Sequence, residues 1–253
     1  MKRLFVLLFS LLLCVVSYAD TINLHWLNED GTTYQNSTCT VNGDLNIPTT
    51  PPTKYGYTFT GWKLSNYIPI EYLESTGTQW IDTGFKPTNK TVAEIDYQFT
   101  QLPRSGTSYQ IGAGSDNNST RFRFIISSNG NGMDCSLGTN VSFSGINALN
   151  RHILKIDAIN RTCSIDNTLE NQINNYFSGS DRTFYIFNLN NGSSIYKHYA
   201  RCFYLKIYDN NTLVRDFIPV LDYNGVPCMY DRVTQQFFYN QGTGQFIAGP
   251  VLQ

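Results

Sequence analysis

The feature that most constrains the fold is a two-residue alternation of large apolar side chains in the C-terminal quarter of the chain. There, Phe203, Leu205 and Ile207 alternate with more polar residues, which is the period of a strand with one buried face. The stretch 209–212 then reads Asp-Asn-Asn-Thr, and a tight turn is expected because Asn and Asp tolerate left-handed backbone. A second apolar run follows at 213–221. The segment therefore predicts a β-hairpin whose large side chains face a core.

The N-terminal residues have the pattern of a secretory signal peptide. A basic start precedes an apolar run at 4–16, and small residues end the segment at 17–19. The run is shorter than the roughly 20 residues that cross a bilayer, so we expect cleavage after Ala19 and a protein that is secreted or held at the cell surface. Cys14 leaves a lipoprotein alternative open, although Leu13 before it is larger than lipoprotein processing prefers.

Composition favours an all-β protein with little net charge. Cleavage leaves 253 − 19 = 234 residues, with 18 − 2 = 16 basic and 19 acidic side chains and a net charge of −3. This charge predicts neither a nucleic-acid partner nor an anionic membrane surface. Tyr and Phe together number 17 + 16 = 33, and aromatic residues mixed with turn formers are typical of strand-rich secreted proteins.

Five cysteines remain after cleavage: Cys39, Cys135, Cys163, Cys202 and Cys228. Their spacings are long and include no Cys-x-x-Cys pair, so a zinc cluster is not expected. An oxidising exterior permits up to two disulfides with one thiol left over. Burial as small apolar residues is the alternative for each cysteine.

Residues 20–66 have the pattern of a small separate domain. Apolar residues alternate with polar ones at 22–26, a turn is expected at 28–31, and a short strand is expected at 38–41. The run 48–55 is too rich in proline for a helix or a central strand. A last strand is expected at 56–62, which reads Gly-Tyr-Thr-Phe-Thr-Gly-Trp.

That ending, with the opening strand and the proline-rich run, resembles the internalin-type B repeat, also called the Listeria–Bacteroides repeat. The resemblance covers about one repeat. It implies a β-grasp-like fold in an extracellular, often adhesive, bacterial protein. We expect Tyr57, Phe59 and Trp62 to form the core of this repeat rather than a binding site.

Residues 67–253 contain short alternating segments separated by turn signals. The clearest is 91–99, in which Ala93, Ile95, Tyr97 and Phe99 share one face and polar residues share the other. Further strands are expected at 122–127, 152–158 and 183–189, with a turn at 160–161 and a loop or helical turn at 171–180. Many strands without a helical period predict a β-sandwich.

Three stretches of this part, 72–84, 122–127 and 209–244, resemble the concanavalin A-like, laminin G-like jelly roll. The resemblance implies two antiparallel sheets in an all-β jelly-roll sandwich. It also implies glycan or protein binding outside the cell. Some members of that family bind calcium, and some are enzymes. The resemblance leaves a calcium ion open, and no cofactor is otherwise expected.

The segment 94–98, which reads Glu-Ile-Asp-Tyr-Gln, is a candidate catalytic site. β-Glucanase-type jelly-roll hydrolases carry Glu-x-Asp followed by another Glu on one strand, because the period of two aims all the carboxylates into the sugar cleft. Here Glu94 and Asp96 share a face, but Gln98 stands in the third position and cannot donate the proton. We therefore expect no catalytic residues at this site and a solvated outer face instead.

The sequence contains no other recognisable set of catalytic or metal-binding residues. His25, His152 and His198 lie far apart, and His152 is expected to be a hydrogen-bonded core residue. No metal site is expected, and the Gly-x-Ser-x-Gly elbow of serine hydrolases does not occur.

Binding residues are not identified by the sequence alone. Trp80, Tyr204 and Tyr208 would suit a sugar if they faced outward, and the loop 116–118 carries oxygens for sugar or calcium. Packing and turn formation explain these residues equally simply, so the ligand-binding residues stay unknown. The expected function is a non-catalytic surface protein that binds an extracellular glycan or protein. The alternatives are a divergent carbohydrate-active hydrolase and a structural spacer.

Overall fold

The computed structural model divides the chain into two compact units, Met1–Trp62 with Gln253, and Lys63–Leu252. It describes residues 21–27, 33–40, 46–53, 55, 58–59, 67–105, 107–114, 118–127, 132–167, 169–174, 176–192 and 198–252. The expected signal peptide, 1–19, lies outside these ranges. Within them, the one helical element is the 3₁₀ turn η1 (Asn118–Thr120). No helix of this described part is long and apolar enough to cross a membrane.

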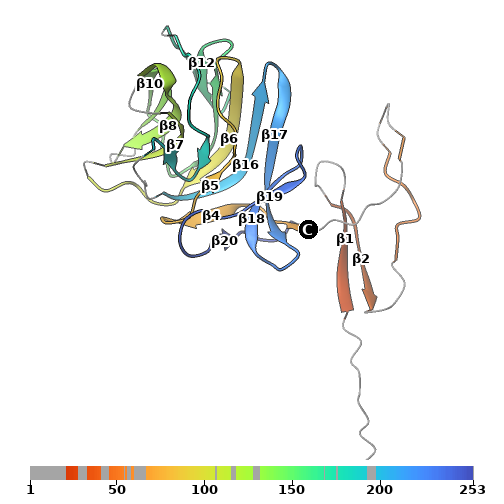
Figure 1. Ribbon diagram of the computed structural model, residues 1–253. Helices are drawn as coiled ribbons and strands as arrows, with labels where there is room; N and C mark the ends of the chain where they lie inside the picture. The colour runs from red at the N-terminus through yellow and green to blue at the C-terminus, as the bar shows by residue number, and fades with distance from the viewer. Residues whose placement is uncertain are drawn as a thin grey trace, which may run out of the picture. The chain divides into compact units, whose positions relative to one another are not determined.

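The smaller unit contains an antiparallel hairpin of β1 (Thr21–Leu27) and β2 (Thr33–Thr40) (Figure 1). The indole nitrogen of Trp26 donates to Ser37 Oγ across the pair at 2.8 Å. The second strand begins earlier than the expected segment 38–41. Residues 46–53, which include most of the proline-rich run, form no strand, as predicted. Most of 56–62 lies outside the described residues, but 58–59 form no strand and Phe59 is 39% exposed. The predicted core position is therefore wrong for Phe59, and the rest of the last strand stays a prediction.

The larger unit is a β-sandwich of two sheets, which confirms the predicted fold class. The first sheet runs in the order β13 (Leu169–Gln172), β12 (Thr162–Ile165), β11 (Arg151–Asp157), β6 (Thr91–Phe99), β16 (Tyr199–Asp209), β17 (Thr212–Asp222), β18 (Pro227–Asp231) and β19 (Gln236–Phe238). In the same sheet, β3 (Tyr67–Pro69) pairs with β17, β4 (Leu73–Thr76) with β16, and β20 (Ile247–Ala248) with β4.

The second sheet runs in the order β10 (Thr139–Ser144), β9 (Gly132–Leu137), β8 (Phe122–Ser127), β7 (Ser108–Ala113), β14 (Tyr185–Ile186) and β5 (Ile81–Asp82). A short strand, β15 (Leu189–Asn190), pairs with β7 in parallel. The other pairings of both sheets are antiparallel.

The core lies between the two sheets and follows the alternation of β6. Ala93, Ile95, Tyr97 and Phe99 are each at most 2% exposed, as the sequence predicts. The Tyr97 ring lies 5.7 Å from the ring of Phe187. Burial of a large apolar side chain such as Ile95 or Phe99 contributes about 1.5–3 kcal/mol, so this strand anchors the sandwich.

A disulfide between Cys135 on β9 and Cys163 on β12 joins the two sheets. The remaining described cysteines, Cys39, Cys202 and Cys228, are buried free thiols. One of the two disulfides that the cysteine count permits is therefore present among the described residues. The other three described cysteines show the predicted alternative, burial as small apolar residues.

The predicted hairpin is present as β16 and β17, the long pair drawn in blue beside β6 in Figure 1. Asn210 and Asn211 form its turn with φ of 49° and 62°, in the left-handed region that Asn tolerates. One residue departs from the prediction. A bulge between Cys202 and Tyr204 shifts the register, so Phe203 does not join Leu205 in the core cluster. A bulge adds one residue to a strand and reverses the alternation on one side of it.

Candidate functional site

The two carboxylates tested as catalytic groups lie on the outer face of β6, and both are engaged. Arg151 donates from Nε and Nη2 to the two oxygens of Asp96, at 2.8 and 2.7 Å. The hydroxyl of Tyr204 donates to Glu94 at 2.9 Å. Asp96 is only 5% exposed, so the prediction of a solvated outer face is wrong for this residue. The third position, Gln98, donates its amide to a backbone carbonyl at 3.0 Å.

Stacked cations cover the aromatic rings beside these carboxylates. The guanidinium of Arg151 lies 3.6 Å above the centre of the Phe203 ring, and that of Arg201 lies 4.4 Å above the Tyr72 ring. Arg201 also donates to Glu74 at 2.6 Å. A ring face that already carries a guanidinium is not open to a sugar. This part of the outer face is therefore a network that stabilises the sheet.

The aromatic residues considered for binding are mostly packed. The Trp80 ring lies 4.3 Å from the Tyr185 ring at an angle of 30°, and it packs against the core. Burial and the neighbouring Glu94 carboxylate raise the pKa of Tyr204, and its hydroxyl is engaged there. Tyr208 is half-buried, opposite Leu213. Trp80 and Tyr204 thus form no open platform.

The histidines and carboxylates of the described residues form no metal-binding cluster. In the described residues, no three His, Cys, Asp or Glu side chains gather as a metal site would require. His152 is hydrogen-bonded, as predicted: its Nδ1 lies 2.8 Å from Asp166 Oδ2, and its Nε2 lies 3.0 Å from a backbone carbonyl. It is half-buried and does not belong to the core cluster, so the predicted core position is wrong. In the loop 116–118, Asp116 and Asn117 lie outside the described residues. So does the side chain of His25.

His198 is a buried residue of the larger unit. It is 1% exposed, and burial lowers its pKa from 6.5 to about 3. Its Nε2 accepts from the backbone N–H of Gln110 at 2.6 Å. This contact places the ring proton on Nδ1 and keeps the imidazole neutral, so we assign it a structural role.

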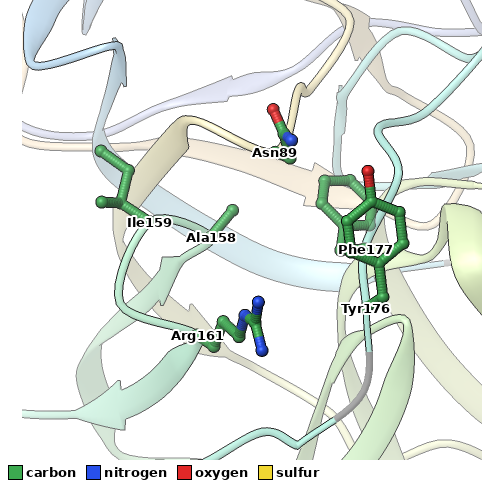
Figure 2. A pocket seen from close by; sticks show the side chains of 6 residues that line it. All are labelled: Asn89, Ala158, Ile159, Arg161, Tyr176 and Phe177. Atoms are coloured by element: carbon green, nitrogen blue, oxygen red, sulfur yellow. The ribbon is translucent and has the colours of Figure 1, made fainter.

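A hollow of about 110 Å³ lies where two turns and a loop of the larger unit meet. Figure 2 shows the side chains around it, with the Arg161 guanidinium, the Asn89 amide and the Tyr176 ring arranged about the opening. Its lining residues are Asn89, Ala158, Ile159, Arg161, Tyr176 and Phe177. They come from the segment before β6, from the turn between β11 and β12, and from the connection between β13 and β14.

The turn that presents Asn89 is fixed by hydrogen bonds of its own. The backbone N–H of Thr91 donates to the Thr88 carbonyl at 3.1 Å, and that of Lys90 donates to the Thr88 hydroxyl at 3.1 Å. The N–H of Asn210 donates to the Lys90 carbonyl at 3.1 Å. Asn89 therefore lies at the tip of a pinned turn.

The turn that presents Arg161 is held more firmly. The N–H of Asn160 donates to the Asp157 carboxylate at 2.9 Å. The Arg161 carbonyl accepts from the Ile173 N–H at 2.8 Å and from the Gln172 amide at 3.2 Å. Arg161 itself has φ of 56°, a conformation that the surrounding bonds must maintain. Its backbone is thus fixed while its side chain projects beside the hollow.

Tyr176 is displayed beside an anchored neighbour. Phe177 is 5% exposed, and its ring lies 5.7 Å from the core ring of Phe122. The next residue, Ser178, donates its backbone N–H to the Ser119 carbonyl at 3.1 Å. Tyr176 in contrast is 62% exposed, so a large ring is held at the surface by its buried neighbour.

The polar ends of Asn89, Arg161 and Tyr176 make no hydrogen bond or ion pair within the described part of the chain. An exposed ring beside an amide and a guanidinium is the combination that holds sugars, because the ring covers the apolar face of the sugar and the polar groups bond its hydroxyls. No carboxylate lines the hollow. The arrangement suits binding and lacks a general acid or base.

Sequence reasoning did not identify these residues. It predicted a turn at 160–161, which the strand bounds confirm, and a loop or helical turn at 171–180. Residues 171–172 belong instead to β13, whereas 173–174 and 176–180 lie outside the strands. Nothing in the sequence shows that two turns and a loop separated by about 70 and 15 residues would meet, because that depends on the pairing order of the strands.

No protein-family model matches the chain, and no curated protein is similar to it. The likenesses to the B-type repeat and to the laminin G-like jelly roll therefore stay predictions from the sequence.

Proposed function

We propose that this protein is an exported, non-catalytic binding module that holds a glycan at the hollow between Asn89, Arg161 and Tyr176. The observation that carries the proposal is the convergence of these three side chains, which come from two turns and a loop and have no partner for their polar ends among the described residues. Fixed turns reduce the ordering cost of binding, which favours a site over three unrelated surface residues.

Export is supported by two independent features. The first 19 residues have the pattern of a signal peptide. The disulfide between Cys135 and Cys163 is typical of oxidising compartments. Within this proposal, the likeness to laminin G-like and B-type modules makes the protein a bacterial surface or secreted protein whose two units serve attachment.

A glycan microarray with the purified mature protein tests the function. We expect binding to at least one glycan class and its loss in Tyr176→Ala, since the exposed ring supplies the apolar contact surface. Tyr223→Ala is the matched control, because Tyr223 is also highly exposed, at 78%, but lies on the turn between β17 and β18. Calcium added and chelated separates a direct contact from a calcium-dependent one.

The alternatives make different predictions in the same experiment. A structural spacer gives a blank array. A hydrolase shortens the arrayed or soluble glycans, and that activity would have to disappear in Glu94→Ala if the outer face of β6 were its site. The hydrogen bond to Glu94 and the ion pair of Asp96 favour the binding module.

A further inference from the structure

We infer that the hollow between Asn89, Arg161 and Tyr176 selects an acidic sugar, one that carries a uronate carboxylate or a sulfate ester. This inference rests on the proposed glycan-binding function and narrows it to one charge class. The deciding group is Arg161, whose guanidinium points toward the opening in Figure 2. A guanidinium offers five N–H donors in a planar fork, which matches the oxygens of a carboxylate or a sulfate.

The carboxylates of Asp157 and Asp209, which lie beside these turns, are occupied by neutral donors and do not pair with Arg161. Asp157 accepts from the N–H and the side-chain amide of Asn160, both at 2.9 Å. Asp209 accepts from the hydroxyls of Thr88 and Thr91, at 2.5 and 3.1 Å. No described carboxylate lies within ion-pairing distance of the Arg161 guanidinium. The charge of Arg161 is therefore available to an anion from outside.

The remaining groups around the hollow fit the neutral part of such a sugar. The Tyr176 ring presents an apolar face, and Ile159, 42% exposed, adds apolar surface across the opening. The Asn89 amide both donates and accepts, which suits a sugar hydroxyl. An anion on Arg161, a ring on Tyr176 and a hydroxyl on Asn89 together define a monosaccharide unit with one charged substituent.

The charge class is tested by measuring dissociation constants for matched oligosaccharides. Uronate-containing and sulfated oligosaccharides are compared with the same chains after carboxyl reduction or desulfation, and with neutral chains of equal length. We expect the native acidic oligosaccharides to bind at least tenfold more tightly than their neutralised forms, because a tenfold change corresponds to about 1.4 kcal/mol and a charge-assisted hydrogen bond is worth that much. Loss of binding after carboxyl reduction identifies the anion as a carboxylate, and loss after desulfation identifies it as a sulfate.

Arg161→Gln removes the charge and keeps a shorter polar side chain. We expect it to weaken binding of the acidic oligosaccharides at least tenfold and to remove the difference in affinity between acidic and neutral ones. Arg161→Lys keeps the charge but loses the fork, so we expect an intermediate loss. The charge-matched control is Arg104→Gln, since Arg104 is exposed and belongs to another loop. Circular dichroism and thermal unfolding establish that each variant folds.

Each outcome separates the inference from the function on which it rests. Equal affinity for acidic and neutral chains, or an Arg161→Gln variant that binds acidic chains normally, overturns the charge selection and leaves the glycan function intact. A protein that binds no glycan overturns both. Binding of an acidic peptide in place of every oligosaccharide overturns the glycan function while retaining Arg161 as an anion contact.

Discussion

Arg151 on β11 forms a two-bond ion pair with Asp96 on β6 and lies at the same time over the ring of Phe203 on β16. One guanidinium thus connects three adjacent strands of the larger sheet. The contact depends on the bulge that turns Phe203 to the outer face. The Asp96 carboxylate is 7% exposed and the Arg151 side chain 48% exposed, so the acid is covered and the base remains partly solvated.

We expect Asp96→Asn to lower the free energy of unfolding by about 1–2 kcal/mol. This value is at the low end for hydrogen bonds to charged groups because Arg151 is partly solvated. Chemical denaturation by urea measures it. Asp181→Asn is the control, since Asp181 is 65% exposed and lies 3.8 Å from Arg182, and it should change stability by less than about 0.5 kcal/mol.

A double-mutant cycle with Arg151→Met isolates the pair from other effects of the aspartate. We expect a coupling free energy of about 1 kcal/mol between the two positions. If the two losses simply add, then the contact makes no net contribution to stability, and the account of this outer face as a stabilising network is wrong.

Buried His198 makes the larger unit sensitive to acid. Its pKa is about 3 in the folded protein, because burial penalises the charged form, against 6.5 as its ordinary value. The unfolded chain therefore binds more protons below pH 6.5. The contribution of neutral His198 to the free energy of unfolding is fully present above pH 6.5. It is lost as the pH falls from 6.5 toward 3, by up to about 1.4 kcal/mol per pH unit.

His198→Gln tests this dependence, since glutamine keeps an acceptor for the Gln110 N–H but does not titrate. We expect the stability of the parent protein to fall more steeply than that of the variant between pH 6.5 and 5, where carboxylates contribute little. Urea unfolding at several pH values measures both slopes. Parallel curves would show that the ring is not kept neutral in the folded state.

The alternation of apolar residues allowed much of the larger unit to be predicted. On β6, Ala93, Ile95, Tyr97 and Phe99 lie on the predicted core face. Glu94 and Asp96 lie on the predicted outer face. The turn at Asn210 was also predicted, because few residues accept left-handed backbone there. These features depend on local chemistry and on a period of two, which a single sequence contains.

The features that were not predicted depend on contacts between distant segments. The bulge at Phe203 has no local signal, because one added residue leaves the composition of the strand unchanged. The pairing of Cys135 with Cys163 and the meeting of Asn89, Arg161 and Tyr176 follow from strand order. Strand order is set by the packing of the whole sandwich, and no single segment encodes it.

The disulfide gives a count of thiols that is simple to measure. If the chain is cleaved after Ala19, as proposed, it should contain three free thiols, Cys39, Cys202 and Cys228, and five after reduction of the disulfide. Burial raises the pKa of Cys228 to about 12 and also raises that of Cys202, so we expect both thiols to react slowly before denaturation. A titration in denaturant with and without reductant gives both numbers, and one extra thiol would indicate that Cys14 is retained.

Removing the disulfide should destabilise the sandwich without changing its fold. Cys135 and Cys163 are 28 residues apart, and a crosslink of this length contributes about 3–4 kcal/mol in the chain-entropy description. We expect Cys135→Ala/Cys163→Ala to lose about that much in urea denaturation. Cys202→Ala provides the comparison for loss of a buried sulfur alone. A double variant that is as stable as the parent would mean that the crosslink does not form.

Gly242 is required by a close approach between the closing loop and the loop after β4. A Cβ atom at Gly242 would lie 1.8 Å from the Thr78 carbonyl oxygen and 3.0 Å from Cδ1 of Trp80. The backbone must move to admit it, so we expect Gly242→Ala to lower the free energy of unfolding by about 1–3 kcal/mol and to change the fluorescence of Trp80. Gly225→Ala separates the cost of a steric clash from the cost of a positive φ. At Gly225 a Cβ meets nothing within 4 Å, but φ is +76°. We expect that control to cost about 1–2 kcal/mol with unchanged Trp80 fluorescence. A fluorescence change of equal size in both variants would contradict the close contact at Gly242.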